Sequence, residues 1–170
     1  MTEHKTRTSG WPAHRVTGVD VWPFRLLPGS AEFLLLHRSG RDGSPFWQGV
    51  SGWIELDEAP HLAALRELRE ETGLEAVALY GVDAVFDLYA WKRGTVETIV
   101  PFAAQVPADG EPRLSDEHDD WRWVVLPEAL DLVPYEPQRA ALRRISADLL
   151  ERPELAHLYR IEPTEAAGGR

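Results

Sequence analysis

Three glutamates, Glu67, Glu70 and Glu71, are spaced so that their side chains share one face of an α-helix. Carboxylates packed this closely repel one another and raise each other's pKa unless a cation lies among them. Hard oxygen ligands on a rigid helix suit Mg²⁺ or Mn²⁺. Arg66 could pair with Glu58 or Glu70 and so fix the orientation of a carboxylate. Taken alone, the three glutamates favour a solvated acidic helix face over a metal site.

The residues around the glutamates favour the metal site over the solvated acidic face. From Gly52 the chain reads Gly, five residues, Glu, seven residues, then Arg-Glu-apolar-X-Glu-Glu-X-Gly-apolar, ending at Leu74. This pattern resembles the signature box of the Nudix hydrolases at every defined position. The resemblance implies an α/β protein, a Nudix-type α/β/α sandwich with a mixed β-sheet, in which the box forms a loop, a helix and a second loop.

The same resemblance implies a pyrophosphohydrolase that splits a diphosphate linkage by water attack, with Mg²⁺ or Mn²⁺ as its cofactor. Metal ions neutralise phosphate oxygens and generate a nucleophile from bound water, while positioning does most of the remaining work. In the family, an arginine at the position of Arg66 orients the ligands, often with a glutamate at the position of Glu58. We favour Glu70 as the general base. The implied metal ligands are the backbone carbonyl of Gly52 and the side chains of Glu67, Glu70 and Glu71.

The segment before the box gives an indication of the substrate class. FWQGVSG, residues 46–52, resembles the dihydroneopterin triphosphate and dATP-type pyrophosphohydrolases. Trp47 could stack on a base or pterin ring, or could equally be a core or loop aromatic. Gln48 could hydrogen-bond the ring edge. Arg38 ends an apolar run. By analogy with the family it could contact a phosphate, and it could equally be a plain surface arginine.

The resemblance and these residues favour a nucleoside triphosphate or a pterin triphosphate as substrate. Tyr89 and Trp91 lie at about the spacing beyond the box that suggests dinucleoside polyphosphates, so hydrolysis of those compounds is the first alternative. A non-catalytic Nudix-like ligand-binding module is the second alternative. Such modules often lose box carboxylates, whereas this box retains all of them.

An acidic segment, SDEHDD at residues 115–120, precedes the short apolar run WRWVVL. The helix supplies carboxylates from one side only, and a metal-bound diphosphate needs ligands or a base from another direction. By its position the segment resembles a loop in which several Nudix enzymes carry a further glutamate. We therefore expect Glu117 to be a metal ligand, with the neighbouring aspartates as alternatives and a solvated charged loop as the competing interpretation.

Strand and helix signals alternate along the chain, which is typical of a layered α/β domain. Pro60 suits a first helical turn and Gly73 suits a helix C-terminus. Residues 1–13 are predicted to be a flexible arm, 14–160 a single domain and 161–170 a flexible tail. We expect strands at 15–27, 31–38, 77–89 with a break at Gly81, 95–106 and 121–126, and helices at 60–73, 127–132 and 137–150.

The length of 170 residues fits one domain, and 44% hydrophobic with 27% charged residues is a globular composition. The absence of cysteine excludes disulfides, thiolate zinc sites and a cysteine nucleophile. With 28 acidic and 18 basic residues, the net charge of −10 argues against binding a nucleic-acid duplex or an anionic membrane. A small anionic, nucleotide-like substrate would then need a metal as mediator. No segment reads as a membrane span or secretion signal, so we expect a cytoplasmic monomer or homodimer.

Overall fold

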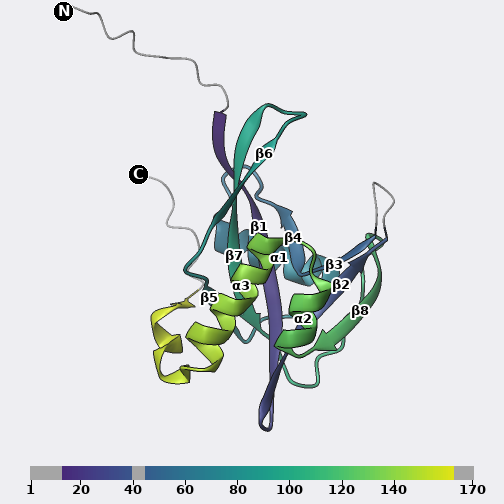
Figure 1. Ribbon diagram of the computed structural model, residues 1–170, viewed down its shortest axis with the longest axis vertical. Helices are drawn as coiled ribbons and strands as arrows, with labels where there is room; N and C mark the ends of the chain where they lie inside the picture. Colours follow the sequence, from purple (N-terminus) through teal and green to yellow (C-terminus); the bar gives the residue numbers. More distant parts are fainter. Residues whose placement is uncertain (1–12, 40–44, 163–170) are drawn as a thin grey trace, which may run out of the picture.

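The computed structural model describes residues 13–39 and 45–162, which form one mixed sheet with helices on both faces (Figure 1). The strands are β1 (Ala13–Leu27), β2 (Ser30–Arg38), β3 (Phe46–Gln48), β4 (Val50–Trp53), β5 (Ala78–Gly81), β6 (Phe86–Ala90), β7 (Thr95–Gln105), β8 (His118–Val124) and β9 (Arg160–Ile161). The α-helices are α1 (Pro60–Thr72), α2 (Leu126–Leu132) and α3 (Glu136–Ile145), and α3 continues into a π-helical turn, η1 (Ser146–Leu150), and a 3₁₀ helix, η2 (Pro153–Leu158).

Strand β1 organises the sheet. It pairs antiparallel with β2 and β4 along one side and parallel with β7 along the other. The order is β3-β2-β1-β7-β5-β9, with β4, β6 and β8 attached to β1, β7 and β2. Because β2 pairs with β1 only from Phe24 onward, the place beside Gly18–Val21 is taken by β4, which carries Gly52. The predicted mixed sheet is confirmed.

Side chains of β1 alternate between the two faces of the sheet. Val19 and Val21 pack in the same core cluster as Leu68 of α1, whereas Trp22 belongs to the cluster that contains Leu142 of α3. Figure 1 shows α2 and α3 lying together over one face. Helices therefore cover both faces, and the predicted α/β/α sandwich is confirmed.

Helix α1 has the predicted boundaries. Pro60 stands in its first turn, where a missing N–H costs no hydrogen bond. Gly73 ends the helix with a φ of 67°, a left-handed conformation that favours glycine, and its N–H donates to the carbonyl of Arg69 at 2.8 Å. Leu68 is fully buried on the apolar face of the helix, and of the glutamates Glu71 is buried as well while Glu70 is exposed.

The C-terminal half differs from the predictions at β8 and at α3. Strand β8 begins at His118, three residues before the predicted start, so residues 118–120 pair with β2 instead of forming a loop. The predicted helix over 137–150 is regular only as far as Ile145. The predicted break at Gly81 is confirmed.

Most of the predicted arm and tail lies outside the described residues. Ala13 belongs to β1 and Ile161 to β9, so the sheet reaches one residue into each predicted flexible segment. Among the described residues, no helix is long and apolar enough to cross a membrane.

Candidate active site

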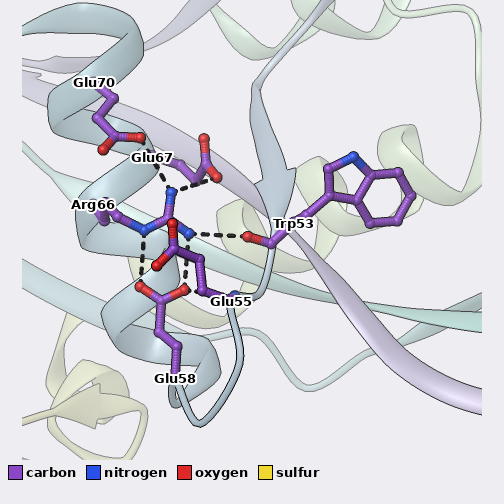
Figure 2. A network of polar contacts seen from close by, with 6 residues as sticks. All are labelled: Trp53, Glu55, Glu58, Arg66, Glu67 and Glu70. Carbon is purple, nitrogen blue, oxygen red and sulfur yellow. Dashed lines mark hydrogen bonds and ion pairs between the residues drawn. The ribbon is translucent and has the colours of Figure 1, made fainter.

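The guanidinium of Arg66 is the centre of a polar network at the start of α1 (Figure 2). Two of its nitrogens donate to the two carboxylate oxygens of Glu58, each at 2.8 Å. Its Nη1 donates to Glu67 at 2.7 Å and to Glu70 at 3.1 Å, and its Nη2 donates to the carbonyl of Trp53 at 2.9 Å. The hydrogen bonds from Arg66 lower the pKa of Glu58, and those to the glutamates raise the pKa of Arg66. One arginine thus fixes three carboxylates and the end of β4.

The loop between β4 and α1 is tied to the same network. Glu58 accepts a hydrogen bond from the backbone N–H of Glu55 at 2.9 Å, while its own N–H donates to the carbonyl of Glu55 at 3.2 Å. Asp57 within this turn has a φ of 63°, which is unusual for a residue with a side chain. The turn therefore presents Glu58 to Arg66 in one orientation, and both of the pairings expected for Arg66 occur.

Gly52 and Glu67 are in direct contact. A Cβ atom at position 52 would lie 1.9 Å from Cδ of Glu67 and 2.1 Å from its Oε1. The carboxylate therefore occupies space that any side chain on residue 52 would take. Burial raises the pKa of Glu67, although the hydrogen bond from Arg66 opposes this shift.

Glu71 is the most buried carboxylate of the box, at 6% exposure. Its Oε2 has no hydrogen-bond partner. Burial, with the charges of Glu67 and then Glu117, raises its pKa to about 8. Nε2 of His118 lies 4.0 Å from this oxygen, and burial lowers the pKa of His118, so the imidazole supplies little positive charge. Glu71 is thus a buried acid whose charged form is only partly compensated, by a backbone hydrogen bond from Ser51 and by the charge of Arg38.

Glu117 is distant from the box in the sequence but lies near Glu71 in the structure. The backbone N–H of Ser115 donates to the carbonyl of Glu71 at 3.1 Å, which ties the segment before β8 to the end of α1. Arg38, which ends β2, has its Nη1 3.9 Å from Oε2 of Glu117. The expected proximity of Glu117 to the helix carboxylates is therefore found, with an arginine beside it.

A cavity of about 820 Å³ joins these groups. Its charged lining comes from the box, from the segments facing it, and from β1 and β6: Glu55, Arg66, Glu67, Glu71, Arg38, Glu117, Asp20 and Asp87. Its apolar lining comes from β1, β6, β7 and the start of α3: Val19, Phe86, Leu88, Ile99, Tyr135 and Pro137. One pocket therefore offers carboxylates, arginines and an apolar wall to a single ligand.

The NUDIX domain model matches residues 16–149, which is most of the chain. The chain belongs to the Nudix family.

Curated relatives of this Nudix chain carry several activities in their names. It is 38% identical over 124 residues to the octanoyltransferase of Myxococcus xanthus, covering 69% of this chain but only 33% of that protein. It is 35% identical over 139 residues to the asymmetrical bis(5'-nucleosyl)-tetraphosphatase of Rattus norvegicus, covering 77% of this chain and 92% of that protein. It is 31% identical over 123 residues to the dihydroneopterin triphosphate diphosphatase of Haemophilus influenzae, covering 65% and 76%.

Solved structures of Nudix proteins share the fold. A NUDIX hydrolase structure from Listeria monocytogenes is 26% identical, with a TM-score of 0.69 over 79% of this chain and 94% of that one. A binary complex of the Ap4A hydrolase of C. elegans is 26% identical, with a TM-score of 0.67 over 79% and 97%. The Nudix resemblance and fold class inferred from the box are thus confirmed.

The structure brings only some of the predicted Nudix site residues into the cavity. Six of them line it: Arg38, Gly52, Arg66, Glu67, Glu71 and Glu117. Glu58 and Glu70 are not among the lining residues but are bonded to Arg66, and Glu70 is 59% exposed at its side chain. Of the alternatives to Glu117, Asp119 pairs with His37 and Asp120 bonds to the N–H of Trp121.

Trp47 and Gln48 lie on β3 and are not among the residues that line the cavity. The Trp47 ring packs against His37, with centroids 4.9 Å apart, and under the guanidinium of Arg122. Gln48 is buried, with its Nε2 3.4 Å from Nε2 of His118. Their predicted contacts with a substrate ring therefore have no geometric support here, and Gln48 instead reaches the box indirectly, through the imidazole next to Glu71.

The lining residues that were not predicted include a buried polar pair, Asp20 on β1 and Gln138 on α3. The available signal was a lone carboxylate within the apolar segment Val19–Trp22 of a strand that must be buried. Gln138, one turn into an amphipathic helix, gave no comparable signal.

Two features of this structure fit a divalent cation at the Nudix box. The unpartnered, buried oxygen of Glu71 lacks the positive charge that a cation would supply. The bare backbone of Gly52 lets the carboxylate of Glu67 lie against β4. Among the described residues, no three His, Asp or Glu side chains already converge as a complete metal cage, since Arg66 bonds to Glu67 and Glu70. The oxygen donors suit Mg²⁺ or Mn²⁺.

Proposed function

We propose that the protein hydrolyses a diphosphate linkage with the help of Mg²⁺ or Mn²⁺, in a nucleoside triphosphate or a pterin triphosphate. The observation that carries this proposal is the buried and only partly compensated carboxylate of Glu71, in a cavity that also contains Glu67 and Glu117. Buried charges in proteins are paired or coordinate metals. A cluster of this kind beside two arginines suits a substrate that arrives with bound cations.

Each residue of the box has a distinct proposed task. Arg66, held by Glu58, keeps the carboxylate of Glu67 oriented toward the cavity. When bound, the cation neutralises phosphate oxygens and makes water a better nucleophile. Glu70 accepts a proton from the attacking water at its carboxylate, while the water oxygen bonds to phosphorus and the bridging phosphorus–oxygen bond to the leaving phosphate or pyrophosphate group breaks. The proposed metal ligands are the carbonyl of Gly52 and the side chains of Glu67, Glu70, Glu71 and Glu117.

The remaining lining favours a ligand with a flat organic group. Arg38 could contact a phosphate, since its guanidinium stands in the cavity near Glu117. Phe86, Ile99 and Tyr135 form an apolar wall of the kind that holds an aromatic ring. Because an arginine lines one part of the cavity and an apolar wall lines another, the cavity suits a ligand in which a phosphate chain is joined to a heterocycle.

Dinucleoside polyphosphate hydrolysis is the second candidate, and the 35% identity to the rat tetraphosphatase favours it. Tyr89 and Trp91, which suggested it, belong to the exposed β6–β7 hairpin and do not line the cavity. A second nucleoside would then have to leave the cavity and lie along this hairpin. A non-catalytic ligand-binding module is the third candidate, and the intact box weighs against it.

A substrate screen tests the proposal. Purified protein is incubated with Mg²⁺ or Mn²⁺ and GTP, ATP, dihydroneopterin triphosphate, diadenosine tetraphosphate or ADP-ribose, and products are detected through pyrophosphatase and phosphatase coupling. We expect turnover of a triphosphate that chelator abolishes. The Glu71→Gln variant should lose it, and the matched surface variant Glu128→Gln should keep it. Nucleotide binding without turnover of any compound would contradict the proposal in favour of the binding module.

A further inference from the structure

Asp20 and Gln138 form a buried polar pair in the wall of the cavity. Asp20 lies on β1 and is 1% exposed, and Gln138 lies on α3 and is 8% exposed. The side-chain N–H of Gln138 donates to Oδ1 of Asp20 at 3.1 Å. This bond uses one oxygen of the carboxylate and the nitrogen of the amide. Oδ2 of Asp20 and Oε1 of Gln138 are both buried and have no hydrogen-bond partner.

Packing alone does not explain this pair. A buried acceptor left without a donor costs free energy that an apolar residue would not, and most buried polar groups in proteins are paired. Burial raises the pKa of Asp20 to about 7, although its bond with Gln138 opposes the shift. The indole N–H of Trp22 also favours the charged carboxylate, but it does not reach hydrogen-bonding geometry. With Asp20 ionised, the pair therefore leaves two acceptors without a donor, on two residues that line the cavity.

The surroundings suit a flat ring. Phe86 and Ile99 come from β6 and β7, and Tyr135 and Pro137 come from the start of α3, one residue before Gln138. The carboxylate of Asp20 disfavours a phosphate next to it, whereas Arg38 and Arg66 attract one elsewhere in the same cavity. The two kinds of lining therefore orient a ligand with its ring, not its phosphates, at Asp20.

We propose that Asp20 and Gln138 recognise the edge of a heterocycle that presents two neighbouring N–H donors, as the 2-amino-4-oxopyrimidine edge shared by guanine and pterins does. This inference rests on the proposed function and specifies its substrate class. Adenine presents one donor beside a ring acceptor, and that acceptor would face an oxygen of the pair. Sites built on buried hydrogen-bonding groups reject analogues that leave those groups unpaired.

The test compares kcat/KM for GTP and ATP in the wild type and in Asp20→Asn, with Mg²⁺. The wild type should prefer GTP by about tenfold or more. The substituted amide would keep its oxygen toward Gln138 and place an N–H donor where Oδ2 of Asp20 now lies, which matches adenine. The guanine-to-adenine ratio should therefore fall at least about tenfold, with a gain for ATP in absolute terms. Asp131→Asn, an exposed residue of α2 outside the cavity, is the matched control and should leave the ratio unchanged.

Dihydroneopterin triphosphate, in the same assay, distinguishes the two sources of this edge. A higher kcat/KM than for GTP assigns the site to pterins, and a lower one assigns it to guanine. A ratio of GTP to ATP that Asp20→Asn does not change would overturn the inference and make the pair a structural link between β1 and α3. Should Asp20→Asn fail to fold, Gln138→Ala must lower the same ratio without raising the value for ATP, and an unchanged ratio again overturns it.

Calorimetric titration with GMP and AMP, without metal, separates this inference from the proposed function. If no triphosphate is hydrolysed, the proposed function fails, yet the wild type should still bind GMP more tightly than AMP and Asp20→Asn should lose that preference. Equal binding of GMP and AMP by the wild type would contradict the inference whatever the enzyme activity.

Discussion

The carboxylate of Glu67 fills the space beside Gly52, where a Cβ atom would stand 1.9 Å from Glu67 Cδ. Gly52 lies in β4, but α1 also requires a glycine at this position, because only a residue without a side chain leaves room for the Glu67 carboxylate beside β4. Arg66 donates to the same carboxylate at 2.7 Å, so displacing Glu67 would also disturb the contacts to Glu58 and Glu70.

Gly52→Ala should lower turnover by at least about tenfold, which corresponds to about 1.4 kcal/mol of transition-state stabilisation. The added methyl group must push the Glu67 carboxylate away from β4. Steady-state kinetics at saturating metal measure the effect. Gly81→Ala is the control, since a Cβ there meets no atom closer than 3.8 Å. Equal turnover of both variants would show that the position of Glu67 does not matter to the reaction.

Arg66→Lys should reduce turnover and weaken metal binding by about tenfold to a hundredfold, the usual cost of losing a group that orients metal ligands. A lysine keeps the charge but lacks the planar fork that now reaches Glu58, Glu67 and the Trp53 carbonyl together. Metal titration of activity gives both quantities. Arg69→Lys, whose side chain pairs only with Glu75 in the described structure, should behave like the wild type.

The metal-free protein should lose stability as pH rises from about 5 to about 8. The pKa of Glu71 is raised from 4.5 to about 8 in the folded state, so the folded protein binds more protons than the unfolded chain between these values. Its contribution to stability is fully present below pH 4.5 and is lost as pH rises through about 8. Asp20, with its pKa raised to about 7, acts in the same direction.

Thermal unfolding in chelator across this pH range measures the loss, and Glu71→Gln should flatten part of it. Because a divalent cation favours the charged carboxylate, Mn²⁺ should raise Tm more at pH 8 than at pH 5. At pH 8 and above, the variant should fold at least as well as the wild type without metal, since glutamine cannot ionise in the buried site. A Tm that rises between pH 5 and pH 8 in chelator would contradict the assignment.

Glu117→Gln should lower turnover at saturating metal, because Glu117 faces the helix carboxylates from the segment before β8. Asp119→Asn and Asp120→Asn remove the same charge two and three residues further along the chain. Their side chains are occupied by His37 and by the Trp121 N–H, so both variants should be nearly silent in the kinetic assay. If Asp119→Asn or Asp120→Asn lowered turnover and Glu117→Gln did not, the further metal ligand would lie on β8 and not at Glu117.

Local spacing explains why the box could be predicted from the sequence. Gly52, Glu58 and Arg66 lie within one short segment, and its helix starts at a proline and ends at a left-handed glycine, so the residues in contact are close in sequence. The proximity of Glu117 to the helix carboxylates could be predicted because the apolar run that follows it must form a strand of the sheet. The early start of β8 was hidden because Asp119 and Asp120 are poor strand formers, yet both point outward while His118 is buried.

The Asp20–Gln138 contact could not be predicted, because it joins residues 118 positions apart and depends on where α3 crosses the sheet. The same holds for Trp47, whose neighbours His37 and Arg122 are set by the pairing of β2 with β3 and β8. Pairing between distant segments decides which aromatic faces the cavity, and periodicity along one segment carries no information about it.

Mn²⁺ binding and hydrolysis, measured on the same preparations of wild type and Glu71→Gln, test the central claim most directly. Titration calorimetry gives the binding, and coupled assays on the best triphosphate of the screen give turnover. If the buried carboxylate of Glu71 holds the catalytic cation, the variant should bind Mn²⁺ at least about tenfold more weakly and lose turnover by at least about tenfold while remaining folded. Unchanged Mn²⁺ affinity and unchanged turnover in a folded Glu71→Gln variant would contradict the account.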